Sequence, residues 1–164
     1  MAEPRAGVPE LTVVIPAYNE EQSIEPMVER LVLALEQRVD GLEILFVDDG
    51  SRDGTWQRIA ELASRDTRVR GIRFARNFGH QAALTAGVDA ATGRAVVIID
   101  ADLQDPPEVI PEMIERWRAG AEVVYGQREE REGETFFKKA TAAAFYRVLR
   151  RITNVDIPVD TGDF

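Results

Sequence analysis

The sequence has 164 residues, no cysteine and a formal net charge of −9 at pH 7, with 45% hydrophobic and 30% charged residues. This length suffices for one α/β domain and does not comfortably hold two. The acidic balance argues against a nucleic-acid partner held by broad electrostatics. The lack of cysteine excludes a disulfide framework and thiolate chemistry. An anionic substrate stays open, because a local metal ion or arginine cluster can override the global field.

Residues 1–10 hold charged residues and prolines but no apolar core, which is typical of a flexible tail and not of a signal peptide. No apolar run approaches the roughly 18 residues that a membrane-spanning helix needs. These features favour a soluble chain located in the cytoplasm.

Strand-like and helix-like patterns alternate strictly over the first 126 residues. Short apolar and β-branched runs predict strands at 11–16, 43–47, 69–74, 95–99 and 122–126. Apolar residues at helical spacing predict helices at about 23–37, 53–63, 81–90 and 107–117. After a highly charged loop, a further amphipathic helix is expected at 135–150, and residues 151–164 are expected to be irregular.

This alternation predicts crossover connections and a mostly parallel sheet with helices on both faces. Ligands of such sheets bind at the carboxyl ends of the strands. A polar cluster follows every predicted strand, in the order Tyr18-Asn19-Glu20, Asp48-Asp49, Arg76-Asn77, Asp100-Ala101-Asp102 and Gln127-Arg128. Five polar strand ends on one edge are hard to attribute to solvation, so we expect a binding site there.

The acidic pair after the fourth predicted strand points to a metal site. Four β-branched residues at 96–99 predict a buried strand that leads into Asp100 and Asp102, which share one pleat parity if the strand continues. With the amide oxygen of Gln104 nearby, the two carboxylates make an oxygen-rich site suited to Mg²⁺ or Mn²⁺. In the alternative interpretation, Asp100 only ends the strand and Asp102 opens a turn or caps the next helix.

Two phosphate-binding signatures are missing from the sequence. The first βα turn lacks Gly-x-Gly-x-x-Gly, and no Gly-x-x-x-x-Gly-Lys-Ser/Thr occurs. A glycine-rich loop therefore does not cradle a pyrophosphate here, and the acidic pair with a metal ion is the available candidate to balance its charge.

Several motifs, in order, resemble one known family. Val14 to Glu20 (VIPAYNE), Val47 to Thr55 (VDDGSRDGT) and Asp100 to Pro107 (DADLQDPP) resemble family 2 glycosyltransferases of the GT-A fold. The segments RNFGH at 76–80, YGQR at 125–128 and TGDF at 161–164 are similar to the branch that glycosylates polyprenyl phosphates, such as dolichyl-phosphate mannose synthases. The resemblance covers residues 11–164 and implies an α/β, Rossmann-like GT-A domain over that range.

The resemblance also implies a donor site. Its nucleotide-binding residues would be Pro16, Ala17, Tyr18, Glu20, Asp49, Asp100, Ala101 and Asp102. Asp49 would hydrogen-bond the nucleobase, and Asp100 would lie near the ribose and the metal ion. Asp102 would be the main ligand of Mg²⁺ or Mn²⁺ and would serve catalysis, with Gln104 as a further ligand or near neighbour. His80, the only histidine, is interpreted as a pocket-edge or structural residue.

For the acceptor, Arg128 and Arg131 match basic residues of a mobile loop, where a guanidinium fork would recognise a phosphate. The alternative is that the charged run at 128–132 is a solvated, self-paired loop. Asp163 resembles a residue near the reaction centre. Because a phosphate acceptor is already an anion, Asp163 would position it or assist rather than act as a strong base. The resemblance thus implies Asp102, Arg128 and Asp163 as catalytic residues.

The implied activity is metal-dependent, inverting transfer of a hexose from a nucleotide sugar of the UDP-glucose or GDP-mannose type to polyprenyl phosphate. It would take place at the cytoplasmic face of the membrane. A saccharide acceptor, or nucleotide binding without turnover, remains the alternative. The family usually continues past its Gly-Asp-Phe segment, often with membrane-spanning segments, so we expect the C-terminal part of the family's chain to be missing here. The sequence leaves three roles open for the helix expected at 135–150: contact with a membrane surface, packing against the core, or contact between copies of the chain in a homo-oligomer.

Overall fold

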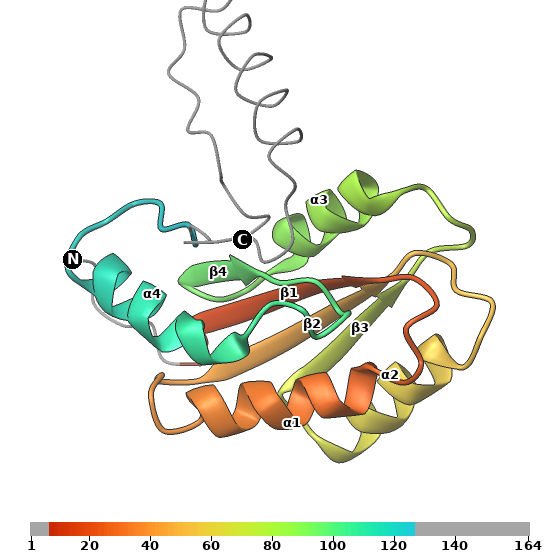
Figure 1. Cartoon of the computed structure of the whole chain (residues 1–164), viewed down its shortest axis with the longest axis horizontal. Coiled ribbons are helices and arrows are strands. Elements are labelled where there is room, and N and C mark those ends of the chain that lie inside the picture. The colour runs from red at the N-terminus through yellow and green to blue at the C-terminus, as the bar shows by residue number, and fades with distance from the viewer. Residues whose placement is uncertain (1–6, 127–164) are drawn as a thin grey trace, which may run out of the picture. The chain divides into compact units, whose positions relative to one another are not determined.

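The computed structural model describes residues 7–126 of the chain (Figure 1). The chain divides into two compact units, Met1–Ala121 and Glu122–Phe164. All the helices and strands of the described residues belong to the first unit. In chain order they are β1 (Leu11–Ala17), α1 (Ile24–Leu35), β2 (Leu42–Asp48), α2 (Thr55–Arg65), β3 (Val69–Arg73), α3 (His80–Ala90), β4 (Ala95–Ile98), the 3₁₀ turn η1 (Pro107–Val109) and α4 (Ile110–Arg118).

The four strands form one parallel sheet in the order β3-β2-β1-β4. The chain moves outward from β1 through β2 to β3 and then crosses back, so that β4 pairs with the other side of β1. Helix α3 makes this crossing and packs on β1 and β2, whereas α1 contacts α2 and α4 on the opposite face of the sheet (Figure 1). The predicted parallel sheet with helices on both faces is therefore confirmed. The reversal of strand order lies between β1 and β4.

The core is built around the two central strands. Every residue of β1 and β2 is buried, which explains why both segments are almost continuously apolar. Helix α1 adds Met27, Leu31 and Leu35 from one stripe, all fully buried. A rigid central layer of this kind fixes where each strand ends and hence where the loops begin.

Two strand predictions need correction. Residues 122–126 form no strand; Val123 is 80% and Tyr125 51% exposed, and within residues 7–126 no other strand pairs with them. A short run of strand-forming residues, here Val123 to Tyr125, does not form a strand without a hydrogen-bonding neighbour. The run 96–99 is also less buried than predicted, with Val96 40% exposed and only Ile99 fully buried. The reason is that β4 pairs with β1 alone among the described strands.

A buried carboxylate fastens the amino-terminal edge of the sheet. Glu43 on β2 accepts hydrogen bonds from the Thr12 hydroxyl at 2.6 Å and the Thr92 amide at 3.0 Å, and it pairs with Arg70. Burial alone would raise the pKa of Glu43, but these bonds together hold the pKa below its ordinary value of 4.5. A depressed folded-state pKa means that this stabilisation is present above about pH 4.5 and is lost as the pH falls further.

Helix α3 sits unusually close to the sheet because Gly87 faces it. A Cβ atom at position 87 would overlap the side chain of Val14 on β1 and come within 3.2 Å of Val47 Cγ2 on β2. Ala83, one turn earlier, is only 1% exposed. Small residues at these two positions therefore set the height of α3 above the strands, and with it the position of the first residue of the helix, His80.

We expect Gly87→Ala to destabilise the protein by about 1–3 kcal/mol, because the added methyl group overpacks the contact with Val14. Thermal unfolding followed by circular dichroism measures the effect. Val88→Ala is the matched control, since Val88 is 44% exposed on the same helix and its truncation should stay within about 0.5 kcal/mol. A melting temperature for Gly87→Ala equal to that of the wild type would contradict the close seating of α3.

Candidate functional site

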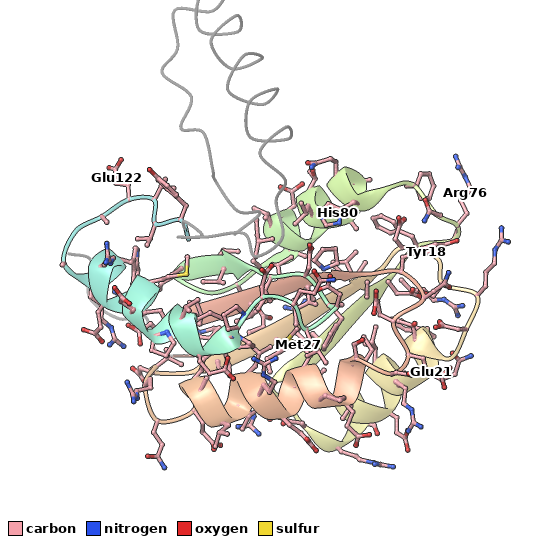
Figure 2. The ribbon with its side chains drawn as sticks, viewed as in Figure 1. Tyr18, Glu21, Met27, Arg76, His80 and Glu122 are labelled. Carbon is pink, nitrogen blue, oxygen red and sulfur yellow. The ribbon has the colours of Figure 1, made fainter. Side chains whose placement is uncertain are left out.

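A cavity of about 370 Å³ opens at the carboxyl ends of β1, β2 and β4, where the strand order reverses. Figure 2 labels Tyr18 just after β1, His80 at the start of α3 and Arg76 on the loop before that helix. The cavity lining comes from four separate segments of the chain: Pro16, Ala17, Tyr18, Glu20, Asp49, Asn77, His80, Ala83, Asp100, Ala101 and Asp102.

The loop after β1 is held by the loop after β2. Asn19, whose φ of 58° is left-handed, donates its backbone N–H to the Ser51 hydroxyl at 2.9 Å. Its side-chain oxygen accepts the Arg52 N–H at 2.9 Å. The Glu20 N–H donates to the Thr55 hydroxyl at 2.8 Å. These cross-loop bonds orient Tyr18 and Glu20 at the cavity, so Ser51 and Thr55 support the site without lining it.

The two aspartates at the end of β2 have different surroundings. Asp48 is fully buried and accepts the Ser51 N–H at 2.9 Å, while its other oxygen lies 3.3 Å from Arg73 Nε. That second oxygen is within ion-pair distance of the guanidinium, but among the described residues it accepts no hydrogen bond of acceptable geometry. Asp48 does not line the cavity. We therefore assign Asp48 to support of the turn.

Asp49, 3% exposed, faces the cavity and also holds the loop that follows β3. Its two oxygens accept the backbone N–H groups of Phe78 at 2.7 Å and Gly79 at 2.9 Å. The next residue, Gly50, has a φ of 70°, and a Cβ there would overlap the backbone of Arg76. Glycine is thus required at position 50 both by its backbone conformation and by the close approach of the second loop.

The acidic pair after β4 contributes Asp100 and Asp102 to the same cavity. Asp102 Oδ1 accepts the Gln104 N–H at 3.0 Å, and the intervening Leu103 has a φ of 64°. Asp102 therefore does form a turn, as the alternative interpretation held, and it lines the cavity as well. His80 Nε2 lies 3.9 Å from Asp100 Oδ1. Gln104 is exposed and is not part of the lining.

These residues suit a divalent ion that is shared with a ligand. Within residues 7–126 no group of three or more His, Cys, Asp or Glu residues converges on one point, so the described chain offers no complete protein cage. Mg²⁺ and related ions commonly take one or two carboxylates, keep several waters and complete their shell with substrate phosphates. Asp100 and Asp102 fit that pattern, and the ion would supply positive charge to an anionic ligand.

The structure brings together all eight residues that the sequence assigned to nucleotide binding, since each of them lines the cavity. The lining also includes Asn77, expected at this edge as a strand-end residue, His80, interpreted from the sequence as a pocket-edge or structural residue, and Ala83. The RNFGH segment pointed to the loop that carries Asn77, but no sequence signal singled out Ala83. The predicted acceptor and catalytic residues Arg128, Arg131 and Asp163 lie outside the described residues.

A second cavity, of about 660 Å³, lies at the opposite edge of the sheet beside Glu43 and Arg70. It is the larger of the two, but its charged lining is largely paired: Arg70 bonds Glu43, and Arg68 bonds Asp66 and Glu36. The smaller cavity is therefore the better candidate site, because it gathers carboxylates at the strand ends where parallel sheets bind their ligands.

The fold and the cavity together define an α/β protein with an acidic ligand site at the switch point of its sheet. The family model described as Glycosyl transferase family 2 matches residues 12–164, and the chain belongs to this family. The chain is 56% identical over 153 residues to an uncharacterized glycosyltransferase, YkcC, of Bacillus subtilis (strain 168), covering 93% of this chain and 47% of that protein.

A further relative is the prophage bactoprenol glucosyl transferase homolog of Escherichia coli (strain K12), which is 43% identical over 155 residues. That match covers 94% of this chain and 50% of the relative. The chain thus spans about half the length of the curated relatives it matches. None of the helices within residues 7–126 is long and apolar enough to cross a membrane.

Among solved structures, the mannosyltransferase PcManGT from Pyrobaculum calidifontis, in complex with GDP-Man and Mn²⁺, is 28% identical with a TM-score of 0.62. The match covers 88% of this chain and 39% of that one. TarS 1-349 of S. aureus, in complex with UDP-GlcNAc, is 19% identical with a TM-score of 0.57, covers 74% of this chain and 38% of that one, and shows the fold alone. The expected GT-A fold is therefore confirmed.

We expect Asp102→Asn to remove most of the gain in UDP or GDP affinity that Mn²⁺ provides, about tenfold or more. The reason is that an amide is a weaker and uncharged ligand for a hard cation. Titration calorimetry with Mn²⁺ and with EDTA measures this gain. Asp89→Asn, an equal loss of charge at an exposed site near the far end of α3, serves as the control. An unchanged Mn²⁺ effect in Asp102→Asn would contradict the metal assignment.

Proposed function

We propose that this chain is the donor-binding catalytic domain of a metal-dependent, inverting transferase. It would move a hexose from a UDP- or GDP-linked sugar to a polyprenyl phosphate at the cytoplasmic face of the membrane. The observation that carries this proposal is the single cavity in which all eight predicted donor residues meet. The similarity to a bactoprenol glucosyl transferase homolog supports the lipid-phosphate acceptor. The 28% identical neighbour in complex with GDP-Man and Mn²⁺ supports a nucleotide sugar and a divalent ion.

In this proposal different residues of the cavity bind different parts of the donor. Tyr18, 40% exposed at the cavity, offers an aromatic face for the nucleobase, and Asp49 offers carboxylate lone pairs for a ring N–H. Asp100 would lie at the ribose and metal, with Asp102 as the main metal ligand. Gln104 remains a predicted further ligand, although unlike Asp102 it does not line the cavity.

On the acceptor side, Arg128 and Arg131 would bind the phosphate of the lipid, and Asp163 would align it behind the anomeric carbon. The phosphate attacks as an anion, the bond from the anomeric carbon to the diphosphate breaks, and the nucleoside diphosphate leaves with that bond's electron pair. Because the nucleophile carries no proton that must be removed, Asp163 positions rather than deprotonates. The positive charges of the metal ion and the arginines would stabilise the departing diphosphate.

A second candidate function is nucleotide binding without turnover. A family 2 transferase with a saccharide acceptor is the other alternative within the enzymes. Donor binding and sugar transfer must therefore be measured separately.

The test is a panel of UDP-glucose and GDP-mannose with farnesyl phosphate as a short acceptor, in Mn²⁺ and in EDTA. We expect one donor to give a metal-dependent farnesyl-phosphate sugar, with inversion of anomeric configuration by NMR. Metal-dependent binding without any product supports the binding-only alternative. Failure of both donors to bind would refute the proposed function.

We expect Arg128→Ala to reduce kcat/KM for transfer about tenfold to a hundredfold, mainly through a higher KM for farnesyl phosphate. The reason is that a charge-assisted guanidinium–phosphate bond is lost. Recognition of the nucleoside part of the donor should stay unchanged. Arg116→Ala, which removes an exposed arginine of α4, is the matched control. The assignment of Arg128 is wrong if its loss weakens binding of uridine or guanosine, which lack phosphate, as much as it weakens transfer.

A further inference from the structure

The cavity has two ends, and one loop runs between them. Asp49 lies at the end of β2, and the acidic pair Asp100 and Asp102 follows β4. The segment Arg76–Gly79 belongs to the loop between β3 and α3 and contributes Asn77 to the lining, and His80, the first residue of α3, follows it and also lines the cavity. A shift of this loop at the Asp49 end of the cavity would therefore also shift the residues next to the acidic pair at the other end.

At the first end, Asp49 holds the loop by its backbone. The carboxylate accepts the N–H groups of Phe78 and Gly79 at 2.7 and 2.9 Å, one on each oxygen. Hydrogen bonds to a buried charged group are among the stronger ones in proteins. Gly79 directly precedes α3 and has no side chain to cap it, with a φ of 98°. A carboxylate from another strand thus fixes the residue from which the helix begins.

At the second end, His80 faces Asp100. His80 is the first residue of α3, and its Nε2 lies 3.9 Å from Asp100 Oδ1. One bridging water or a small side-chain rotation spans this distance. The side chain of His80 is 51% exposed, so it has room to turn toward Asp100, and the backbone position of His80 decides whether the imidazole can reach that carboxylate.

We infer that Asp49, the Arg76–Gly79 loop and His80 form one positioning unit of the donor pocket. Asp49 fixes the loop, the loop fixes His80, and His80 orients Asp100. A carboxylate has about four lone-pair sites, and only two of them are used by the loop, so Asp49 can contact a nucleobase at the same time. The inference rests on the proposed function for the identity of the ligand, but not for the loop contacts.

The first experiment uses no ligand. In Asp49→Asn the side-chain NH₂ cannot accept an N–H, so at least one of the amides of Phe78 and Gly79 loses its acceptor. We expect hydrogen exchange at one or both amides to become about tenfold faster, as for the loss of one such bond. Asp66→Asn, at the C-cap of α2, is the matched control and should leave these amides unchanged. Unchanged protection of both amides in Asp49→Asn would overturn the inference.

The second experiment is a double-mutant cycle on nucleotide binding. UDP and GDP are titrated with Mn²⁺ into the whole chain as wild type, Asp49→Asn, His80→Ala and the double variant. Each single change should lower the affinity for the better-bound nucleotide about tenfold. The double variant should bind no more weakly than the weaker single variant, because both residues act through the same chain of contacts. Losses that multiply to about a hundredfold would overturn the inference, as would a His80→Ala variant that binds like wild type.

The two arms separate the possible failures. His80 is half-exposed, so His80→Ala should fold even if Asp49→Asn does not, and its effect on nucleotide affinity then decides the outcome. If the wild type binds neither UDP nor GDP, the proposed function fails, whereas the exchange experiment still supports or refutes the role of Asp49 in the loop.

Discussion

The burial of β1 between two parallel neighbours is the constraint on which the rest of the structure depends. All seven residues of β1 are buried, and the strand pairs with β2 along its full length and with β4 over four residues. Parallel pairing brings the carboxyl ends of these strands to one edge. The chain's acidic turns must then meet there, although they are far apart in sequence. The cavity is a consequence of this pairing.

Bringing these turns together concentrates negative charge. Glu20, Asp49, Asp100 and Asp102 all line one cavity of about 370 Å³. Carboxylates this close repel one another, and a diphosphate would add further negative charge. A divalent cation would relieve both repulsions at once, which is a physical argument for the proposed metal dependence that does not rely on any relative. Under the proposed function two carboxylates would suffice, because the ligand's phosphates would complete the coordination of the ion.

Much of this could be predicted from the sequence, because hydrophobic periodicity and strand-end polarity are local signals. Four strands, the alternating helices and the edge where the donor residues meet follow from them. The strand expected at 122–126 failed since a strand also needs a neighbour, which a local pattern does not reveal. The contacts of Asp49 with Phe78 and Gly79 join residues 29 and 30 positions apart, so only the tertiary structure shows them. Ala83 lines the cavity because α3 sits low on the sheet, a packing effect that no motif records.

The interlocking of the three loops has a consequence for redesign. The β1 loop is tied to Ser51 and Thr55, and the β2 turn is in turn tied to the backbone of Arg76, Phe78 and Gly79. A change of donor preference made by grafting one loop from a related enzyme would therefore break bonds on the loop left behind. Grafts of all three segments together would keep those bonds intact, which makes the three-loop set the smallest exchangeable part of this pocket.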